Sequence, residues 1–250
     1  ASEPNTLYRN VEGQIFEETD AKAGLTIPSS PYSSWGCNFF DFDNDGWPDL
    51  LVSRGQILPR WLYWYLRMFS AKAANYNIGE HSYRQPQQIF RNRGDGTFEK
   101  LSPAEMGDLG VIRRAGRGSA AGDLDGDGRI DLVLAPISDP VMILRNETPR
   151  SGHWIEILPA AAGDGRTPLH TKVTVGFAGR KAAQEFTIQP SYASGSYVPL
   201  HFGLGSAASI DSIEVVWPEG AVQKLQPVPV DQAYRVSRKD GLLGGLAGLK

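Results

Sequence analysis

Two nine-residue stretches contain the residues best suited to chemistry, and both follow one pattern. The first runs from Asp41 to Asp49 and the second from Asp123 to Asp131. Each places Asp at positions 1, 3, 5 and 9, has Gly at position 6, and is followed by an apolar run. Carboxylates on alternate residues of a tight loop converge on one point, where a hard cation with six to eight oxygen ligands fits. The pattern predicts two calcium sites.

The predicted ligands of the two sites are equivalent. A single Asp-rich loop is more often a solvated turn, but two full copies favour a metal. The EF-hand is excluded because its twelfth position requires Glu, where this chain has Val52 or Leu134. The first predicted ligand set is the side chains of Asp41, Asp43, Asp45 and Asp49 with the Trp47 carbonyl. The second is the side chains of Asp123, Asp125, Asp127 and Asp131 with the Arg129 carbonyl.

The two loops belong to a longer repeat. The offset of 82 residues between Asp41 and Asp123 also maps Tyr8 onto Phe90 and Phe16 onto Phe98. A third start, Ile143-Leu-Arg-Asn, follows 54 residues after the equivalent run that ends at Asn92. Each unit reads as an aromatic-Arg-Asn strand, a turn, a Phe-Glu strand, a connection, an Asp-rich loop and an apolar strand. Repeats of several short strands are typical of propeller blades.

At these residues the chain resembles known families. Leu7-Tyr-Arg-Asn, Arg91-Asn-Arg-Gly-Asp-Gly-Thr-Phe and Asp41-Phe-Asp-Asn-Asp-Gly-Trp-Pro-Asp-Leu are similar to FG-GAP/VCBS calcium-binding propeller repeats. Leu200-His-Phe-Gly-Leu-Gly and Val215-Val-Trp-Pro-Glu-Gly resemble an ASPIC and UnbV domain. This order of parts is similar to the cartilage acidic protein family and its bacterial relatives. The resemblance implies a seven-bladed propeller in complete members, calcium in blade loops, and roles in adhesion or assembly; this chain departs from it with barely two blades.

The predicted fold is mainly β, with two propeller-type blades of an incomplete propeller and a C-terminal β-sandwich-like domain. The blades, with one inserted helix, occupy residues 1–149, and the insertion lies at about 56–88. From about residue 150, short runs such as His153–Leu158 alternate between apolar and polar residues, which is typical of half-buried strands. The C-terminal domain is predicted over 150–238, and residues 239–250 are expected to form an apolar, Gly-rich tail.

The insertion is predicted to contain a helix over residues 59–74. Pro59 suits a first turn, and apolar groups cover most of the circumference. Three alternatives stay open: the helix packs on its own blades, docks on another protein, or lies on a membrane surface. It is too short to span a bilayer. The candidate partner-docking residues are Trp61, Trp64, Tyr65, Met68 and Phe69.

Composition and the remaining reactive residues argue against several functions. The formal net charge is −3, and two bound calcium ions would bring it to about neutral or slightly positive, which disfavours a nucleic-acid partner. The single cysteine, Cys37, rules out an internal disulfide and is expected to be a small buried residue. The four histidines show no metal-ligand or catalytic spacing. We therefore predict that the chain is not an enzyme.

The leading hypothesis is a non-catalytic calcium-binding scaffold or accessory subunit that mediates protein–protein assembly. Calcium loops suit compartments rich in calcium, so a periplasmic or extracellular location is expected. Open sheet edges and the aromatic helix favour other protein subunits as partners, including a membrane protein complex. Contact with a membrane surface is left open. The alternative is a calcium-dependent glycan-binding or adhesion module, and an enzyme acting through the C-terminal domain ranks third.

Overall fold

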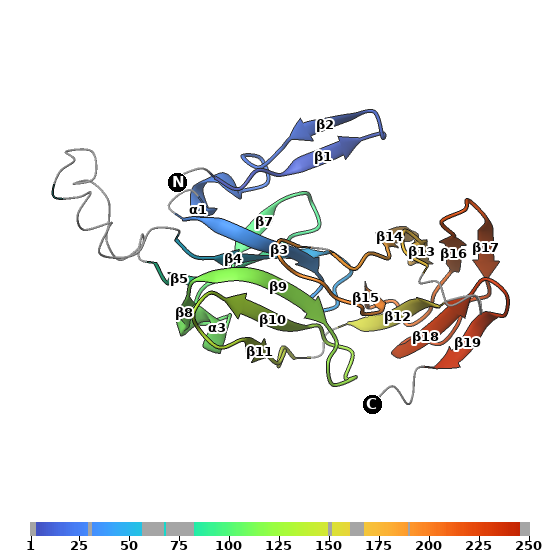
Figure 1. Cartoon of the computed structure of the whole chain (residues 1–250). Helices are drawn as coiled ribbons and strands as arrows, with labels where there is room; N and C mark the ends of the chain where they lie inside the picture. Colours follow the sequence, from blue (N-terminus) through green and yellow to red (C-terminus); the bar gives the residue numbers. More distant parts are fainter. Residues whose placement is uncertain are drawn as a thin grey trace.

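The structure, a computed structural model, describes residues 4–29, 32–56, 68, 83–149, 152–160, 168–189 and 191–245. Within these residues the fold is mainly β (Figure 1), which confirms the predicted class. Two short helices, α1 (Thr26–Ser29) and α3 (Asp108–Val111), lie in connections. The described residues form no closed propeller.

The sequence repeat appears as successive sheets in the N-terminal part. A hairpin comes first, formed by β1 (Tyr8–Val11) and β2 (Ile15–Glu18). The first sheet has four antiparallel strands in the order β3 (Ser34–Phe40), β4 (Asp49–Arg54), β6 (Gln88–Asn92) and β7 (Phe98–Lys100). The second sheet has three, in the order β11 (Met142–Leu144), β10 (Asp131–Pro136) and β9 (Gly116–Gly122). Two short strands, β5 (Gln85–Pro86) and β8 (Arg113–Arg114), pair separately.

The two sheets pack on each other through one apolar cluster. Leu51 from β4 and Leu134 from β10 are almost fully buried within it, together with Phe40 and Leu132. Figure 1 shows β3 and β9 side by side, each at the edge of its own sheet. The Ser119 hydroxyl on β9 donates a hydrogen bond of 2.5 Å to Asn38 Oδ1 on β3. The core therefore lies between the sheets, and the Asp-rich loops extend from one end of it.

The C-terminal part is a sandwich of two four-stranded sheets. One sheet has the order β15 (Leu200–Gly205), β12 (His153–Ala160), β18 (Gln232–Ser237) and β19 (Gly241–Gly245). The other has the order β14 (Arg180–Glu185), β13 (Lys172–Phe177), β16 (Ser212–Val216) and β17 (Val222–Leu225). Strand β13 shows why these segments form strands, because Val173, Val175 and Phe177 alternate into one core shared by both sheets.

Several details differ from the sequence-based expectations. Residues 241–245 form β19, which pairs with β18, so the C-terminal domain extends into the segment expected to be a tail. Cys37 is exposed instead of buried, because the alternation along β3 turns Asn38 and Phe40 inward and Cys37 outward. Met68 is helical and 76% exposed. The other four predicted docking residues, Trp61, Trp64, Tyr65 and Phe69, lie outside the described residues.

Part of the open edge of the blades is covered by the chain itself. The backbone N–H of Cys37 on β3 donates to Ser191 Oγ at 2.9 Å. The equivalent N–H on β9, that of Ser119, donates to Ser194 Oγ at 2.8 Å. Both serines belong to the segment that leads into β15, so one C-terminal segment contacts the same position of both repeats. Among the described residues, no helix has the length and apolar character needed to cross a bilayer.

Candidate metal centres and the domain junction

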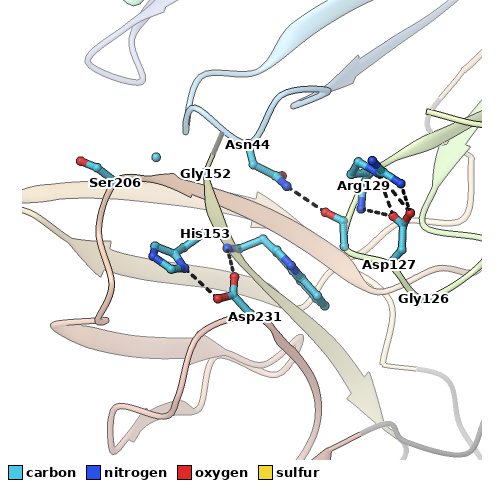
Figure 2. A pocket seen from close by; sticks show the side chains of 11 residues that line it. Asn44, Gly126, Asp127, Arg129, Gly152, His153, Ser206 and Asp231 are labelled. Carbon is cyan, nitrogen blue, oxygen red and sulfur yellow. Dashed lines mark hydrogen bonds and ion pairs between the residues drawn. The ribbon is translucent and has the colours of Figure 1, made fainter. Parts of the chain in front are cut away.

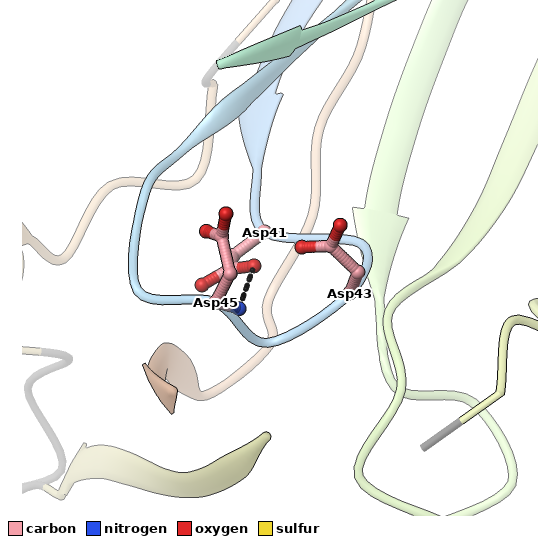
Figure 3. A group of neighbouring side chains, drawn as sticks. All are labelled: Asp41, Asp43 and Asp45. Atoms are coloured by element: carbon pink, nitrogen blue, oxygen red, sulfur yellow. Dashed lines mark hydrogen bonds between the residues drawn. The ribbon is translucent and has the colours of Figure 1, made fainter. Parts of the chain in front are cut away.

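The first Asp-rich loop joins β3 to β4 and gathers three carboxylates. Oxygen atoms of Asp41, Asp43 and Asp45 lie within 4.8 Å of one another, and Figure 3 shows these side chains grouped on the inner side of the loop. The turn is closed by Asp41, whose Oδ1 accepts from the Asp45 amide at 3.1 Å and whose Oδ2 accepts from the Gly46 amide at 2.8 Å. Gly46 has φ of 87°, a conformation that Gly adopts without steric cost.

The electrostatics of this loop favour a bound cation. Burial, with smaller contributions from the neighbouring carboxylates, raises the pKa of Asp41 to about 8, although the Gly46 amide opposes the shift. Burial also raises the pKa of Asp49 to about 7 and raises that of Asp45. Negative charge is therefore costly here without a counter-ion. The loop offers a compact set of carboxylate oxygens, which are the ligands that calcium prefers. A bound cation would also offset the cost of ionising them.

The second loop joins β9 to β10 and gathers a different trio. Oxygen atoms of Asp123, Asp125 and Asp131 lie within 4.8 Å of one another. Asp123 closes the turn as Asp41 does, accepting from the Asp127 amide at 3.2 Å and from the Gly128 amide at 2.7 Å, and it also accepts from the Gly126 amide at 2.8 Å. The loop backbone is therefore the same in both repeats, and the set of converging carboxylates is not.

Asp127 leaves the second group because two arginines engage it. Arg129 Nε lies 3.1 Å from Asp127 Oδ2, and Arg145 Nη2 lies 3.3 Å from the same oxygen. Burial alone would raise the pKa of Asp127, but the hydrogen bonds and charge of Arg129 hold it below its ordinary value. Arg145 Nε also pairs with Asp125 Oδ2 at 2.9 Å. A cation at this loop competes with side chains that already neutralise it.

The ninth position of each loop has a second task. Asp49 is fully buried and accepts from the Phe42 amide at 3.1 Å and from the Asn92 amide at 2.8 Å. Asp131 makes the same two contacts, with the Leu124 amide at 3.1 Å and the Asn146 amide at 2.8 Å. Each of these carboxylates ties its loop to the next strand of the sheet. Their predicted role as calcium ligands stays a prediction.

Residues at the seventh position lie beside the carboxylates. The Trp47 amide donates to Asp45 Oδ1 at 2.7 Å, and the Arg129 amide donates to Asp127 Oδ1 at 3.0 Å. Both residues therefore follow directly after the turn that presents position 5. The use of their carbonyls as ligands also stays a prediction.

Asn44, at position 4 of the first loop, joins three parts of the molecule. Its Nδ2 donates to the Gly128 carbonyl of the second loop at 2.8 Å, and its Oδ1 accepts from His201 Nε2 at 2.7 Å. The Gly205 amide donates to the Asn44 carbonyl at 2.8 Å. Sequence reasoning missed this residue. The signal in the sequence was Asn at a position that Gly126 occupies in the second repeat, since both residue types favour the positive φ, 59° at Asn44, that the structure shows.

The C-terminal domain fits closely against the first loop. A Cβ at Gly203 would clash with Asp41 Oδ2, so the backbone of β15 passes directly over the first carboxylate. Arg180 Nη2 donates to the Gly46 carbonyl at 2.8 Å, and its guanidinium lies 3.7 Å from the centre of the Trp47 ring. Behind this contact, buried His201 lies 3.3 Å from Glu156 Oε1, as expected for a structural histidine.

A cavity of about 670 Å³ opens where the two loops meet the C-terminal domain. His153 Nδ1 lies 2.7 Å from Asp231 Oδ2 on its wall. Ser206 also lines the cavity, but Figure 2 shows its hydroxyl directed away from His153. A groove of about 500 Å³ runs beside the first loop, with Phe39 and Trp47 among its lining residues. The polar groups of the cavity thus form one His–Asp pair and no linked triad among the residues drawn in Figure 2.

Comparisons with known proteins match this architecture. A family model for the FG-GAP-like repeat matches residues 76–167, and the ASPIC and UnbV model matches residues 163–242. Cartilage acidic protein 1 of Mus musculus is 26% identical over 262 aligned residues, and that of Homo sapiens is 29% identical over 264. Both alignments cover 87% of this chain but only 38% and 37% of the relatives, so the chain spans less than two fifths of their length. The chain therefore carries an FG-GAP-like repeat followed by an ASPIC and UnbV domain, as its motifs predicted.

Proposed function

We propose that this chain is a non-catalytic, calcium-binding scaffold that mediates protein–protein assembly outside the cytoplasm. The coarse part of the proposal, a protein-interaction or adhesion module, is supported by the FG-GAP-like and ASPIC and UnbV matches. The finer part is supported by one observation: the first Asp-rich loop is also the surface on which the C-terminal domain rests. Asn44 and Asp41 belong to this loop and also contact the C-terminal domain.

Calcium would act by fixing the geometry of this junction. Without a cation, the first loop holds buried carboxylates whose ionisation is unfavourable. A cation held by Asp41, Asp43 and Asp45 would stabilise their charged forms and restrict the turn that contains Asn44. Any ligand that binds only the folded state stabilises it, by about 2.7 kcal/mol at a hundred times its dissociation constant. Calcium would thereby favour the docked arrangement of the two parts.

The non-catalytic part of the proposal is supported by how the described histidines are used. His201 is buried between Glu156 and Asn44, and His170 pairs with Glu185 at 2.6 Å on the surface. His153 and Asp231 are the strongest contrary candidate because they line the large cavity. If the cavity were an active site, His153→Ala would abolish a hydrolytic activity detectable with ester or phosphoester probes; we expect the wild-type chain to show none.

The proposed location outside the cytoplasm follows from the proposed calcium sites. Sites built from a few carboxylates on surface loops suit the calcium concentrations of extracellular and periplasmic compartments. Association with other protein subunits, including a membrane complex, follows from the same proposal. The segment expected to contact protein or membrane surfaces, around residues 59–74, lies largely outside the described residues.

The experiment that tests the proposal measures calcium binding and domain docking on the same samples. Isothermal titration should give two calcium ions per chain, and chelation should open new protease cleavage sites between the blades and the C-terminal domain. Asp41→Asn should lose one ion and show the cleavage even with calcium. Asp95→Asn, which changes an exposed hairpin carboxylate by the same chemistry, should behave as wild type. Identical melting and cleavage with and without chelator would contradict the proposal.

The groove beside the first loop supports a second candidate, calcium-dependent glycan binding. Its lining combines exposed Phe39 with Trp47, Arg180 and Gln184, close to Asp41. Aromatic faces and planar polar groups are suited to sugar rings. A glycan array probed with calcium and with chelator tests this directly. Calcium-dependent retention that Phe39→Ser abolishes would favour adhesion to glycans over a purely structural groove.

A further inference from the structure

Two asparagine side chains connect the Asp-rich loops to each other. Asn44 of the first loop donates through Nδ2 to the Gly128 carbonyl of the second loop at 2.8 Å (Figure 2). Asn146, which follows β11, donates through Nδ2 to the Phe42 carbonyl of the first loop at 2.7 Å. The two bonds start from different parts of the chain, so the loops are bridged twice.

Each bridge includes a residue that also holds a carboxylate of the second loop. Gly128 accepts from Asn44 through its carbonyl, and its amide donates to Asp123 Oδ2 at 2.7 Å. The Asn146 amide donates to Asp131 Oδ1 at 2.8 Å. Asp123 and Asp131 belong to the carboxylate group that converges in this loop. A displacement of either bridge therefore moves a carboxylate of the predicted second site.

In the first loop, both bridges meet the backbone between the converging carboxylates. Phe42 lies between Asp41 and Asp43, and Asn44 lies between Asp43 and Asp45. Phe42 and Asn44 are both buried. The backbone that positions the first carboxylate group is thus the backbone that the second loop contacts.

The surroundings of the Asn44 bridge leave little room for the loops to move independently. Asn44 Oδ1 accepts from buried His201 Nε2 at 2.7 Å, which fixes the orientation of the amide that reaches Gly128. A Cβ at Gly128 would clash with the Trp154 indole, and a Cβ at Gly152 would clash with the Asn44 carbonyl. Packing this close transmits a displacement instead of absorbing it.

We propose that the two Asp-rich loops form one coupled unit, in which calcium at either loop raises the calcium affinity of the other. An ion at one loop restricts the backbone that carries one end of each bridge, so less freedom remains to be lost when the other loop orders. Each converging group has three carboxylates. These outweigh the charge of one calcium ion, so a loaded loop would not repel a second ion. The inference rests on the proposed calcium sites and adds their regulation.

The test compares the intact chain with two single-site variants by calcium titration calorimetry. Asp43→Asn removes a converging carboxylate from the first loop, and Asp125→Asn removes the equivalent one from the second. The product of the two wild-type association constants, divided by the product of the constants of the single-site variants, is the coupling factor. We expect a factor of about five or more, within the usual range for coupled sites.

Neutral substitutions at the bridges should remove the coupling. Asn44→Gly suits the positive φ of that position, and Asn146→Ala keeps the amide that donates to Asp131. With both changes the factor should fall to about one; each change alone should lower it partway, so the test survives if the double variant does not fold. Asn92→Ala is the matched control, because Asn92 Nδ2 donates to the Pro48 carbonyl of its own loop at 2.9 Å, and it should leave the factor unchanged.

Hydrogen exchange supplies a readout that does not depend on fitted constants. In Asp125→Asn, calcium at the first loop alone should slow exchange of the Gly128 and Asn146 amides, whose acceptors Asp123 and Asp131 remain. Adding Asn44→Gly should remove this effect at Gly128 and preserve it at Asn146.

Three results would overturn the inference. They are a wild-type coupling factor of about one or below, a factor that both bridge variants leave unchanged, and an equal loss of coupling in Asn92→Ala. Two ions that bind independently would remove the coupling and leave the proposed calcium-binding function intact. An absence of calcium binding at either loop would remove both.

Discussion

In the first Asp-rich loop, Asp41 is buried under β15 of the ASPIC and UnbV domain, whereas its counterpart Asp123 in the second loop is half-buried. Both loops share their spacing, their turn and the link from the ninth-position Asp to the next strand. The two loops also differ in residue type at two positions. Position 4 is Asn44 in one and Gly126 in the other, and position 7 is Trp47 in one and Arg129 in the other.

The Asp-rich motif determines the conformation of the loop, whereas the residues around the loop determine which contacts its carboxylates make. Trp47 lies under Arg180 of the C-terminal domain, so the first loop is part of a domain junction. Arg129 instead turns back onto Asp127 and supplies positive charge within its own loop. We therefore expect the first loop to depend strongly on calcium and the second to depend on it weakly.

Asp41→Ala should give the largest effect and test the comparison most severely. It removes the central carboxylate of the first loop, so calcium-dependent stabilisation of the junction should fall by about 3 kcal/mol. Thermal melting with calcium and with chelator measures this difference. Asp123→Ala is the matched change in the second loop and should preserve most of the stabilisation; equal losses in both variants would show that the loops do not differ.

The second-largest effect should be the pH dependence of stability and of calcium affinity at the first loop. In the apo protein, the pKa of Asp41 at about 8 and that of Asp49 at about 7 lie above the ordinary value of 3.8. The folded state then binds more protons than the unfolded state, so apo stability falls as pH rises from about 4 to 8. Calcium needs ionised carboxylates, so its affinity at this loop should fall up to about a hundredfold from pH 8 to 6. A calcium-induced melting shift that is the same at both pH values would contradict this expectation.

Asn44→Gly gives position 4 of the first loop the residue type that Gly126 provides in the second loop. Gly adopts the required positive φ, so calcium binding should survive. The hydrogen bonds to His201 and to the Gly128 carbonyl would be lost, at about 2 kcal/mol in total. We expect a normal calcium stoichiometry with weakened docking, measured by titration and proteolysis. Docking of wild-type strength in this variant would show that Asn44 does not hold the C-terminal domain against the first loop.

Arg129→Gln should have the smallest effect and the opposite sign. It frees Asp127 from one of its two arginines and removes one positive charge from the second loop. Calcium affinity of that loop should rise at least tenfold, because the change removes one positive charge that repels the cation. Arg113→Gln, at an exposed arginine on β8, serves as the control. Unchanged affinity would show that Arg129 does not compete with the metal.

The sequence was sufficient for the features that local spacing determines. The offset of 82 residues relates β1, β2, β3 and β4 to β6, β7, β9 and β10, and alternating apolar residues identified part of the C-terminal sandwich, such as β12 and β13. The contacts of Asn44 were not predictable, because they join residues 84 and 157 positions apart. The pairing of Gly241–Gly245 with β18 was missed because a Gly-rich run carries no strand periodicity. The contact between Arg145 and Asp127 was also not predictable, because it requires the chain after β11 to lie beside the second loop.

Hydrogen exchange at the Gly205 amide would show whether calcium holds the ASPIC and UnbV domain against the first loop. This N–H donates to the Asn44 carbonyl and therefore reports whether the ASPIC and UnbV domain rests on the first loop. We expect protection in calcium, fast exchange after chelation, and fast exchange under both conditions in Asp41→Asn. Equal protection of Gly205 with and without calcium would contradict the account, because the junction would then hold without the metal.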